Sequence, residues 1–165
     1  MSVAYLGIGS NTDAERNVRS AVAALRDRFS ELVLSPVYLS RAVGFEGDDF
    51  INMVARVVTG LEPLALRDYL RDLEDRHGRR RDLPKFSDRT LDIDILIYDD
   101  LVLDLPDLQL PRPEIRKFAH VLKPLVDLAP DLRYPGRDET LAEVWATATC
   151  RDVPLEPLDP AFLDV

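Results

Sequence analysis

Cysteine, long apolar runs and basic charge are all scarce in this sequence, and each scarcity excludes a class of protein. Cys150 is the single cysteine among 165 residues, so the chain cannot form an internal disulfide, which fits a reducing compartment. No apolar run approaches the length of a membrane span, and the opening segment MSVAYLGIGSN lacks the basic start of a signal peptide. We therefore expect a cytoplasmic protein that does not associate with membranes.

The chain is acidic, with one basic run that stands apart. Lys and Arg number 21 against 30 Asp and Glu, which gives a net charge of −9. A protein with this balance lacks the basic footprint of general nucleic-acid binding, and we expect no nucleic-acid partner. The run RHGRRR at 76–81 indicates either a site for a small anionic ligand or a solvated basic helix end.

Hydrophobic periodicity predicts one α+β domain over residues 1–165. Over about residues 3–98 the order strand, helix, strand, strand, helix, strand is typical of the ferredoxin-like βαββαβ sandwich, with four antiparallel strands and both main helices on one face. The predicted strands are 3–10, 32–40, 50–59 and 91–98, and the predicted helices run from an N-cap at Thr12 to Phe29 and over 64–77. The C-terminal additions, 99–165, are predicted to hold a short strand, helices near 114–127 and 139–148, and an extended tail.

Two aspartates interrupt the last predicted strand of this core. Asp92 and Asp94 occupy positions in the run LDIDILIY where a strand core favours Val or Ile. Because side chains alternate along a strand, both carboxylates face one side, with their backbones roughly 6–7 Å apart, and the intervening apolar residues face the helices. Like charges this close resist burial, and a hard cation such as Mg²⁺ would relieve the conflict. The alternative is an exposed sheet face with incidental acids.

Arginines near the aspartates favour the metal interpretation. Arg79 and Arg81 lie in the preceding loop, and Arg89 precedes Asp92 by three residues. Phosphoryl transfer needs positive charge from metal and Arg against the developing anion, and Arg grips phosphate with two hydrogen bonds. The combination indicates a Mg²⁺-nucleotide site.

Several motifs, in order along about residues 3–133, resemble those of one enzyme family. FSDRTLDIDILIY at 86–98 resembles the signature W-G-P-R-T-L-D-L-D-I, and LEDRHGRRR at 73–81 resembles E-x-x-x-G-R-x-R. VAYLGIGSN at 3–11, GFEGDDFINMV at 44–54 and PLVDLAPDL at 124–132 are similar to further segments. The family is 6-hydroxymethyl-7,8-dihydropterin pyrophosphokinase, an enzyme of folate biosynthesis.

The resemblance implies a reaction and a set of ligands. ATP would give its β,γ-pyrophosphoryl group to the hydroxymethyl group of the pterin and leave as AMP. Asp92 and Asp94 would hold two Mg²⁺ ions, and the partners would be the two small substrates. We expect a monomer.

The resemblance also assigns the site by position. The catalytic residues would be Arg79, Arg89, Asp92 and Asp94. The residues that contact ATP would be Arg71, Glu74, Arg81, Phe86, Ile95 and Arg112. The residues that contact the pterin would be Asn11, Val43, Phe50, Asn52, Phe86 and His120.

The chain departs from the family pattern mainly at the acceptor end. Phe86 stands where Trp is usual, followed by Ser87 and Asp88 in place of Gly-Pro, and Phe118 and His120 stand where Arg and Phe are usual. The phosphate half therefore matches better than the acceptor half. An ordinary kinase that moves one phosphate to another small acceptor, or a non-catalytic ferredoxin-like ligand-binding module, stays open as an alternative.

Overall fold

The computed structural model describes residues 1–42, 45–78 and 90–163, and the predicted core elements occur in the predicted order. The core elements are β1 (Ser2–Ser10), α1 (Ala14–Arg28), β2 (Leu32–Leu34), β3 (Val37–Ser40), β4 (Phe50–Thr59), α2 (Pro63–Arg76) and β5 (Asp92–Tyr98). The C-terminal elements are β6 (Leu103–Leu105), β7 (Leu108–Leu110), η1 (Pro113–Arg116), α3 (Ala119–Leu128), α4 (Leu141–Thr147), η2 (Thr149–Asp152), β8 (Glu156–Leu158) and η3 (Pro160–Leu163).

The main sheet is antiparallel and has the order β5-β1-β4-β3-β8, with β2 also paired to β4. This confirms the ferredoxin-like arrangement, in which the last strand of the core lies beside the first. The predicted strand 32–40 is divided, because Pro36 has no N–H for a ladder. At the division, the Ser35 hydroxyl accepts a hydrogen bond from Val54 N at 2.8 Å. The sixth strand, β8, comes from the tail that was expected to be merely extended.

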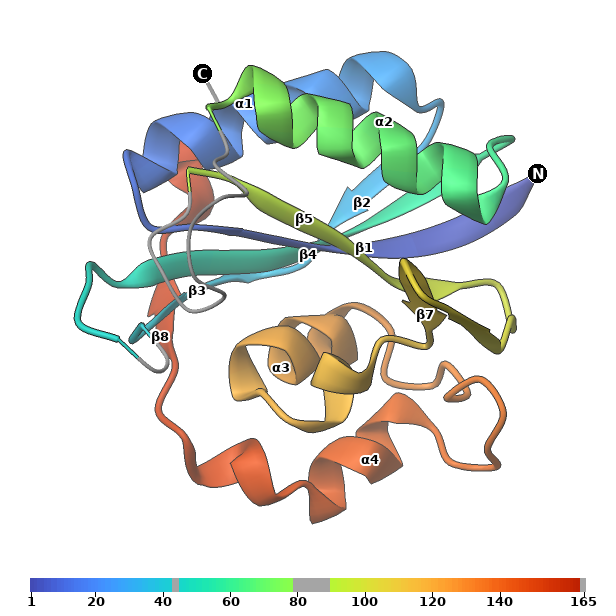
Figure 1. Ribbon diagram of the computed structural model, residues 1–165. Helices are drawn as coiled ribbons and strands as arrows, with labels where there is room; N and C mark the ends of the chain where they lie inside the picture. The colour runs from blue at the N-terminus through green and yellow to red at the C-terminus, as the bar shows by residue number, and fades with distance from the viewer. Residues whose placement is uncertain (43–44, 79–89, 164–165) are drawn as a thin grey trace.

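The sheet has a helical layer on each face (Figure 1). Helices α1 and α2 cover one face, as predicted, and the C-terminal helices α3 and α4 lie on the other. Ile93 and Ile95 of β5 pack in the core beneath α1 and α2, which confirms the predicted alternation. The register between β1 and β5 shifts by one residue near Leu96, so Leu96 and Ile97 both join the second core, under α3.

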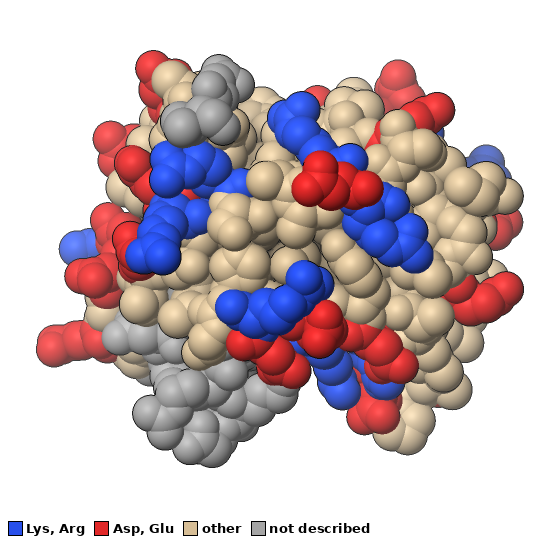
Figure 2. All heavy atoms as spheres, turned by 90° about the horizontal axis from the view of Figure 1, so that it is seen from above, with Lys and Arg blue, Asp and Glu red and all other residues tan. Residues whose placement is uncertain are grey.

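The helices α1 and α2 are amphipathic, and their outer faces carry mixed charge. The residues that α1 buries are Val18, Ala21, Val22 and Leu25, and those that α2 buries are Leu66, Leu70, Leu73 and Glu74. Figure 2 shows acidic and basic side chains interspersed over this outer face, and pairs such as Arg76 with Asp72, at 3.1 Å, belong to it. The predicted N-cap is wrong by one residue. Asp13 occupies that position with a left-handed backbone, and its side chain makes no capping hydrogen bond.

The C-terminal part departs further from the prediction. The helix expected near 114–127 is a short 3-10 turn, η1, followed by a break and then α3. The tail runs past the edge of the sheet, where β8 pairs with β3, and η3 then reaches α1 on the opposite layer. Within the described ranges, no helix is long and apolar enough to cross a membrane.

Burial on α2 provides a test of the core that supports β5. Leu70 is 2% exposed and Leu64, on the same helix, is 43% exposed. We expect Leu70→Ala to lower the free energy of unfolding by about 2–5 kcal/mol, because the lost methyl groups leave a cavity. Leu64→Ala should change it by no more than about 0.5 kcal/mol. Urea unfolding of the two variants measures both values, and equal losses would contradict the burial of α2.

Candidate active site

A cleft of about 580 Å³ runs along β5, the edge strand of the sheet, and extends from α2 on one side to α3 on the other. Strand β5 contributes both aspartates to it, while β1 and β4 form its floor. The predicted site residues that line this cleft are Phe50, Asn52, Arg71, Glu74, Asp92, Asp94, Ile95, Arg112 and His120. The fold therefore brings together residues that lie up to 70 positions apart in the sequence.

The floor of the cleft is a row of paired strand residues with a glycine at its centre. Gly9 of β1 lies opposite Asn52 of β4 on one side and Asp92 of β5 on the other. Gly7 is similarly opposite Asp94. A Cβ atom at Gly9 would lie 3.4 Å from Asn52 Oδ1, so the missing side chain is what leaves space between the amide and the carboxylate. The spacing G-x-G inside a buried strand is the signal that could have revealed this floor.

The aspartates form the anionic end of the cleft. Both are half-buried, and Arg112 Nη2 lies 3.6 Å from Asp94 Oδ1 while its Nε lies 3.2 Å from Glu114 Oε2. The described residues contain no group of three or more His, Cys, Asp or Glu side chains that could enclose a metal by themselves. Two carboxylates suit Mg²⁺, which keeps waters and takes phosphate oxygens as its other ligands. The donor set therefore fits magnesium bound together with a nucleotide.

Glu74 has a structural role that the sequence did not indicate. Its side chain is 4% exposed, and Oε2 accepts a hydrogen bond from Ile93 N at 2.9 Å. Ile93 lies between Asp92 and Asp94, so this hydrogen bond connects the segment that carries both aspartates to α2. Arg67 and Arg71 line the same side of the cleft, and Arg67 bridges α2 to Asp107, near β7, at 3.4 Å.

The other end of the cleft is aromatic and holds a buried amide. Asn52 is 6% exposed, and its Nδ2 donates to Ser40 Oγ at 2.7 Å and to the Phe50 carbonyl at 3.3 Å. The rings of Phe118 and His120 stack at 5.2 Å between centroids. Burial lowers the pKa of His120, and the nearby Asp92 carboxylate opposes this shift. A neutral, flat imidazole therefore forms part of the wall.

One predicted contact residue does not line the cleft. Asn11 is buried, and its Nδ2 donates to the Asp48 carbonyl at 3.1 Å, which ties the end of β1 to the loop before β4. This hydrogen bond holds that loop, and the expected contact of Asn11 with the pterin stays a prediction. The remaining predicted site residues, Val43, Arg79, Arg81, Phe86 and Arg89, lie outside the described residues.

Further lining residues were not among the predicted ones. They include Gly7, Gly9, Arg41, Phe45, Arg67, Asp107, Glu114, Lys117 and Phe118. Phe45 meets the Phe50 ring edge-on, with centroids 6.4 Å apart. Lys117 and Arg41 add positive charge at the mouth, and neither belongs to a motif or to a periodic pattern. Only the folded arrangement identifies them.

The fold and the cleft define an α+β enzyme of ferredoxin-like architecture with an anionic pair among cationic side chains. Residues 5–130 match the model of the 7,8-dihydro-6-hydroxymethylpterin-pyrophosphokinase (HPPK) family. The 2-amino-4-hydroxy-6-hydroxymethyldihydropteridine pyrophosphokinase of Pseudomonas aeruginosa is 42% identical over 135 residues, which cover 79% of this chain and 83% of that protein. The enzyme of the same name from Aquifex aeolicus is 34% identical over 145 residues, covering 87% and 90%. This chain belongs to the HPPK family.

A solved structure has the same fold. The wild-type HPPK-DHPS of Plasmodium falciparum, crystallised with pterin and p-hydroxybenzoate, superposes with a TM-score of 0.69 at 14% identity. The match covers 91% of this chain but 43% of that larger protein, so it speaks for the fold alone. With the family established by the sequence relatives, the chain is an enzyme of folate biosynthesis that transfers the pyrophosphoryl group of ATP to 6-hydroxymethyl-7,8-dihydropterin.

The glycine floor gives a direct test of the cleft. We expect Gly9→Ala to fold, because its methyl group meets Asn52 Oδ1 at an ordinary contact distance of 3.4 Å. The methyl group should nonetheless fill the space that a ligand uses and weaken pterin binding by about 1–3 kcal/mol. Calorimetric titration with the pterin and a non-hydrolysable ATP analogue measures this. Gly60→Ala, at an exposed site outside the cleft, is the control; equal affinities for both variants would mean that the floor is not used.

Proposed function

We propose that the cleft beside β5 carries out the pyrophosphoryl transfer, with Mg²⁺ held by Asp92 and Asp94 and with AMP as the second product. The observation that carries this proposal is the row formed by Asn52, Gly9 and Asp92 across three neighbouring strands. A polar amide at one end, a carboxylate at the other and no side chain between them suit an acceptor that must approach a metal-bound triphosphate.

The phosphate end is proposed to work by charge. Bound Mg²⁺ would neutralise the triphosphate oxygens and the charge that develops as the bond to the leaving group breaks. Asp92 and Asp94 would hold two ions, as the family resemblance implies. Arg112, which already pairs with Asp94 at 3.6 Å, can turn to a phosphate oxygen when the aspartate binds metal. We also propose phosphate contacts for Arg79, Arg81 and Arg89.

The acceptor end is proposed to orient the pterin. Because Asn52 Nδ2 is engaged by Ser40 Oγ, the amide has a fixed direction, and its oxygen can accept a hydrogen bond from an N–H on the pterin edge. Phe50 and His120 would enclose the flat ring system. A site that hydrogen-bonds the polar edge of its ligand strongly favours that ligand over one without such an edge, because the second ligand leaves buried polar groups of the site unpaired.

The proposed step is a displacement at the β-phosphorus. The hydroxymethyl oxygen of the pterin forms the new O–P bond, and the bond from that phosphorus to the α,β-bridging oxygen breaks. AMP leaves with the bridging oxygen, and the hydroxyl proton is lost to water. Exclusion of bulk water would keep hydrolysis from competing.

We also propose that residues 1–165 act as one pyrophosphokinase domain, monomeric and cytoplasmic. The packing of the tail supports the first point, because β8 pairs with β3 and η3 contacts α1. Both termini of the described chain therefore belong to the same layered unit. The single buried cysteine, Cys150, is in keeping with a reducing compartment.

The nucleotide product decides between this step and an ordinary kinase reaction. With Mg-ATP and the hydroxymethyl pterin, we expect AMP and pterin diphosphate to accumulate in equal amounts, because attack at the β-phosphorus leaves no other nucleotide. Anion-exchange chromatography of a time course separates AMP from ADP. Stoichiometric ADP would contradict the proposal and indicate transfer of the γ-phosphate alone.

The metal assignment has its own test. Asp92→Asn and Asp94→Asn keep the side-chain volume and remove the charge, and we expect each to lower turnover by more than about 100-fold, since loss of even outer-shell partners of a metal typically costs 10- to 100-fold. Excess Mg²⁺ should restore part of the activity. Asp100→Asn, at an exposed position just after β5, is the matched control and should behave as the wild type. Wild-type activity of both cleft variants at low Mg²⁺ would show that the ions bind elsewhere.

A further inference from the structure

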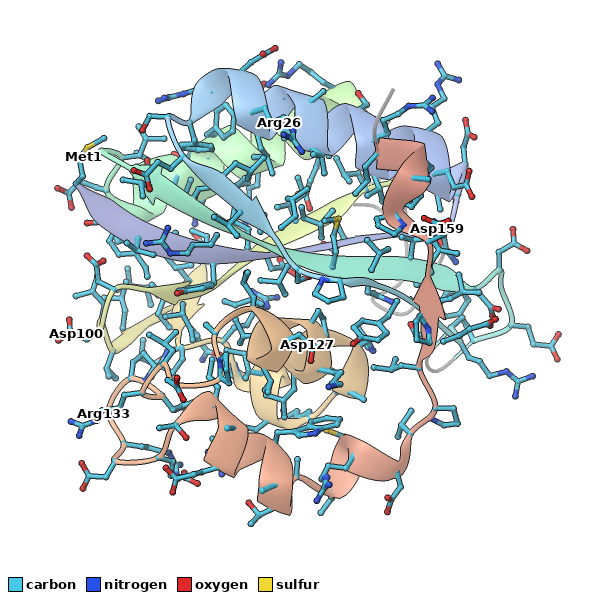
Figure 3. The ribbon with its side chains drawn as sticks, turned by 180° about the vertical axis from the view of Figure 1, so that it is seen from behind. Met1, Arg26, Asp100, Asp127, Arg133 and Asp159 are labelled. Atoms are coloured by element: carbon cyan, nitrogen blue, oxygen red, sulfur yellow. The ribbon has the colours of Figure 1, made fainter. Side chains whose placement is uncertain are left out.

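A chain of polar contacts joins β3 to the C-terminal end of α3 and continues to α4. Tyr38 donates its hydroxyl to Asp127 Oδ2, and Lys123 Nζ donates to Asp127 Oδ1 at 2.7 Å. Lys123 Nζ also lies 5.7 Å from the ring centroid of Trp145. Burial, with a contribution from Asp127, raises the pKa of Tyr38 to about 12, so the hydroxyl keeps its proton at neutral pH. Figure 3 labels Asp127 on the helix beneath the sheet.

Tyr38 lies next to the row that forms the cleft floor. It lies directly opposite Asn52 in the register of β3 and β4. Ser40, two residues along the same strand, accepts the hydrogen bond from Asn52 Nδ2. Residues two apart on a strand face the same side, so Tyr38 and Ser40 both face the layer that contains α3. The hydroxyl of Tyr38 thus reaches α3 from the strand that also fixes the cleft amide.

The first turn of α3 is closed by hydrogen bonds from Val121 N and Leu122 N to the Phe118 carbonyl, but the helix lacks two further stabilising features. Phe118, at the N-cap position, provides no side-chain capping hydrogen bond. Pro124 lies inside the helix and has no N–H to donate to the carbonyl of His120, four residues earlier. His120 and Asp127 are seven residues apart, close to two helical turns, and therefore lie on the same face of α3. A contact that fixes Asp127 thereby fixes the face that carries His120.

We infer that Tyr38 is a positioning residue for the acceptor end of the cleft, which it controls by binding Asp127 and so setting how α3 presents the His120 ring. The inference rests on the proposed function, in which His120 encloses the pterin. The Tyr38 side chain is buried, and its hydroxyl is the group that binds Asp127. Lys123 occupies the second oxygen of Asp127 and thus leaves Oδ2 for the tyrosine.

Tyr38→Phe tests the role because it keeps the ring and removes the hydroxyl. We expect the KM for the pterin to rise by about threefold to tenfold, the range that the loss of one buried hydrogen bond corresponds to. The KM for ATP should not change, because the phosphate end rests on β5. An unchanged pterin KM would overturn the inference.

Tyr98→Phe is the matched control. The Tyr98 hydroxyl is also engaged, donating to the Leu61 carbonyl at 2.6 Å, but its ring belongs to the core on the α1 and α2 side of the sheet. This variant should lose a similar amount of stability and leave the pterin KM unchanged. An equal rise in pterin KM in both variants would overturn the inference, because it would show a general effect of destabilisation.

The NMR signals of the histidine rings provide a second test. A general loss of stability would not change the signals of one histidine selectively. The sequence has two histidines. His77 follows the last residue of α2, its ring nitrogens lie 2.8 Å from the Leu73 carbonyl and from Ser20 Oγ, and it serves as an internal reference. In proton–carbon spectra at a fixed pH, Tyr38→Phe should shift or broaden the His120 ring signals and leave those of His77 in place. Unshifted His120 signals would contradict the inference.

A double variant separates this inference from the proposed function. His120→Ala should raise the pterin KM, and adding Tyr38→Phe should then have little further effect, because the two residues act through one helix. If His120→Ala leaves the pterin KM unchanged, the acceptor wall of the proposed function is wrong. If His120→Ala raises the pterin KM but the two effects add independently, the positioning role of Tyr38 is wrong.

If Tyr38→Phe fails to fold, Asp127→Ala replaces it as the test. Asp127→Asn keeps an acceptor oxygen, so the pterin KM of this variant should lie closer to the wild-type value than that of Asp127→Ala.

Discussion

The hydrogen bond from Ile93 N to the buried carboxylate of Glu74 is the contact on which the site depends most directly. Strand β5 lies at the edge of the sheet, and among the described residues no strand pairs with its outer side. Glu74 satisfies one of these groups from α2, and Ile93 lies between the two aspartates. A displacement of β5 relative to α2 would therefore move the carboxylates of Asp92 and Asp94 together. The apolar side chains of Ile93 and Ile95 add to this, because they cannot leave the core without exposing apolar surface.

The opposite layer completes the site. The βαββαβ core alone would leave the aspartates on an open sheet face, since α1 and α2 cover the other side. The C-terminal segment that contains η1 and α3 closes that face and brings Arg112, Phe118 and His120 to the cleft. The tail then runs along the edge of the sheet and reaches α1. The C-terminal segment therefore connects the two helical layers, in addition to the sheet that lies between them. The functional surface therefore belongs to the additions as much as to the ferredoxin-like core.

The part of the site that the sequence predicted is the part that depends on local geometry. Alternation along β5 placed Asp92 and Asp94 on one face and the isoleucines on the other, because a strand has a period of two residues whatever its surroundings. The same rule, applied to Gly7 and Gly9, would have revealed the bare floor. The division of 32–40 at Pro36 was also within reach of the sequence, whereas the pairing of β8 with β3 was not, because such a pairing joins residues more than 100 positions apart.

The acceptor end could not be predicted in this way because long-range contacts hold it. The amide of Asn11, for example, donates a hydrogen bond to the carbonyl of Asp48, 37 residues away. The Tyr38–Asp127 contact spans 89 residues and carries no local signature. Such contacts determine the position of the element that forms a wall of the cleft, but they do not determine which side chains line that wall. Alternation along β5, by contrast, fixes which positions can present a carboxylate to the cleft, because every second side chain of a strand faces the same side.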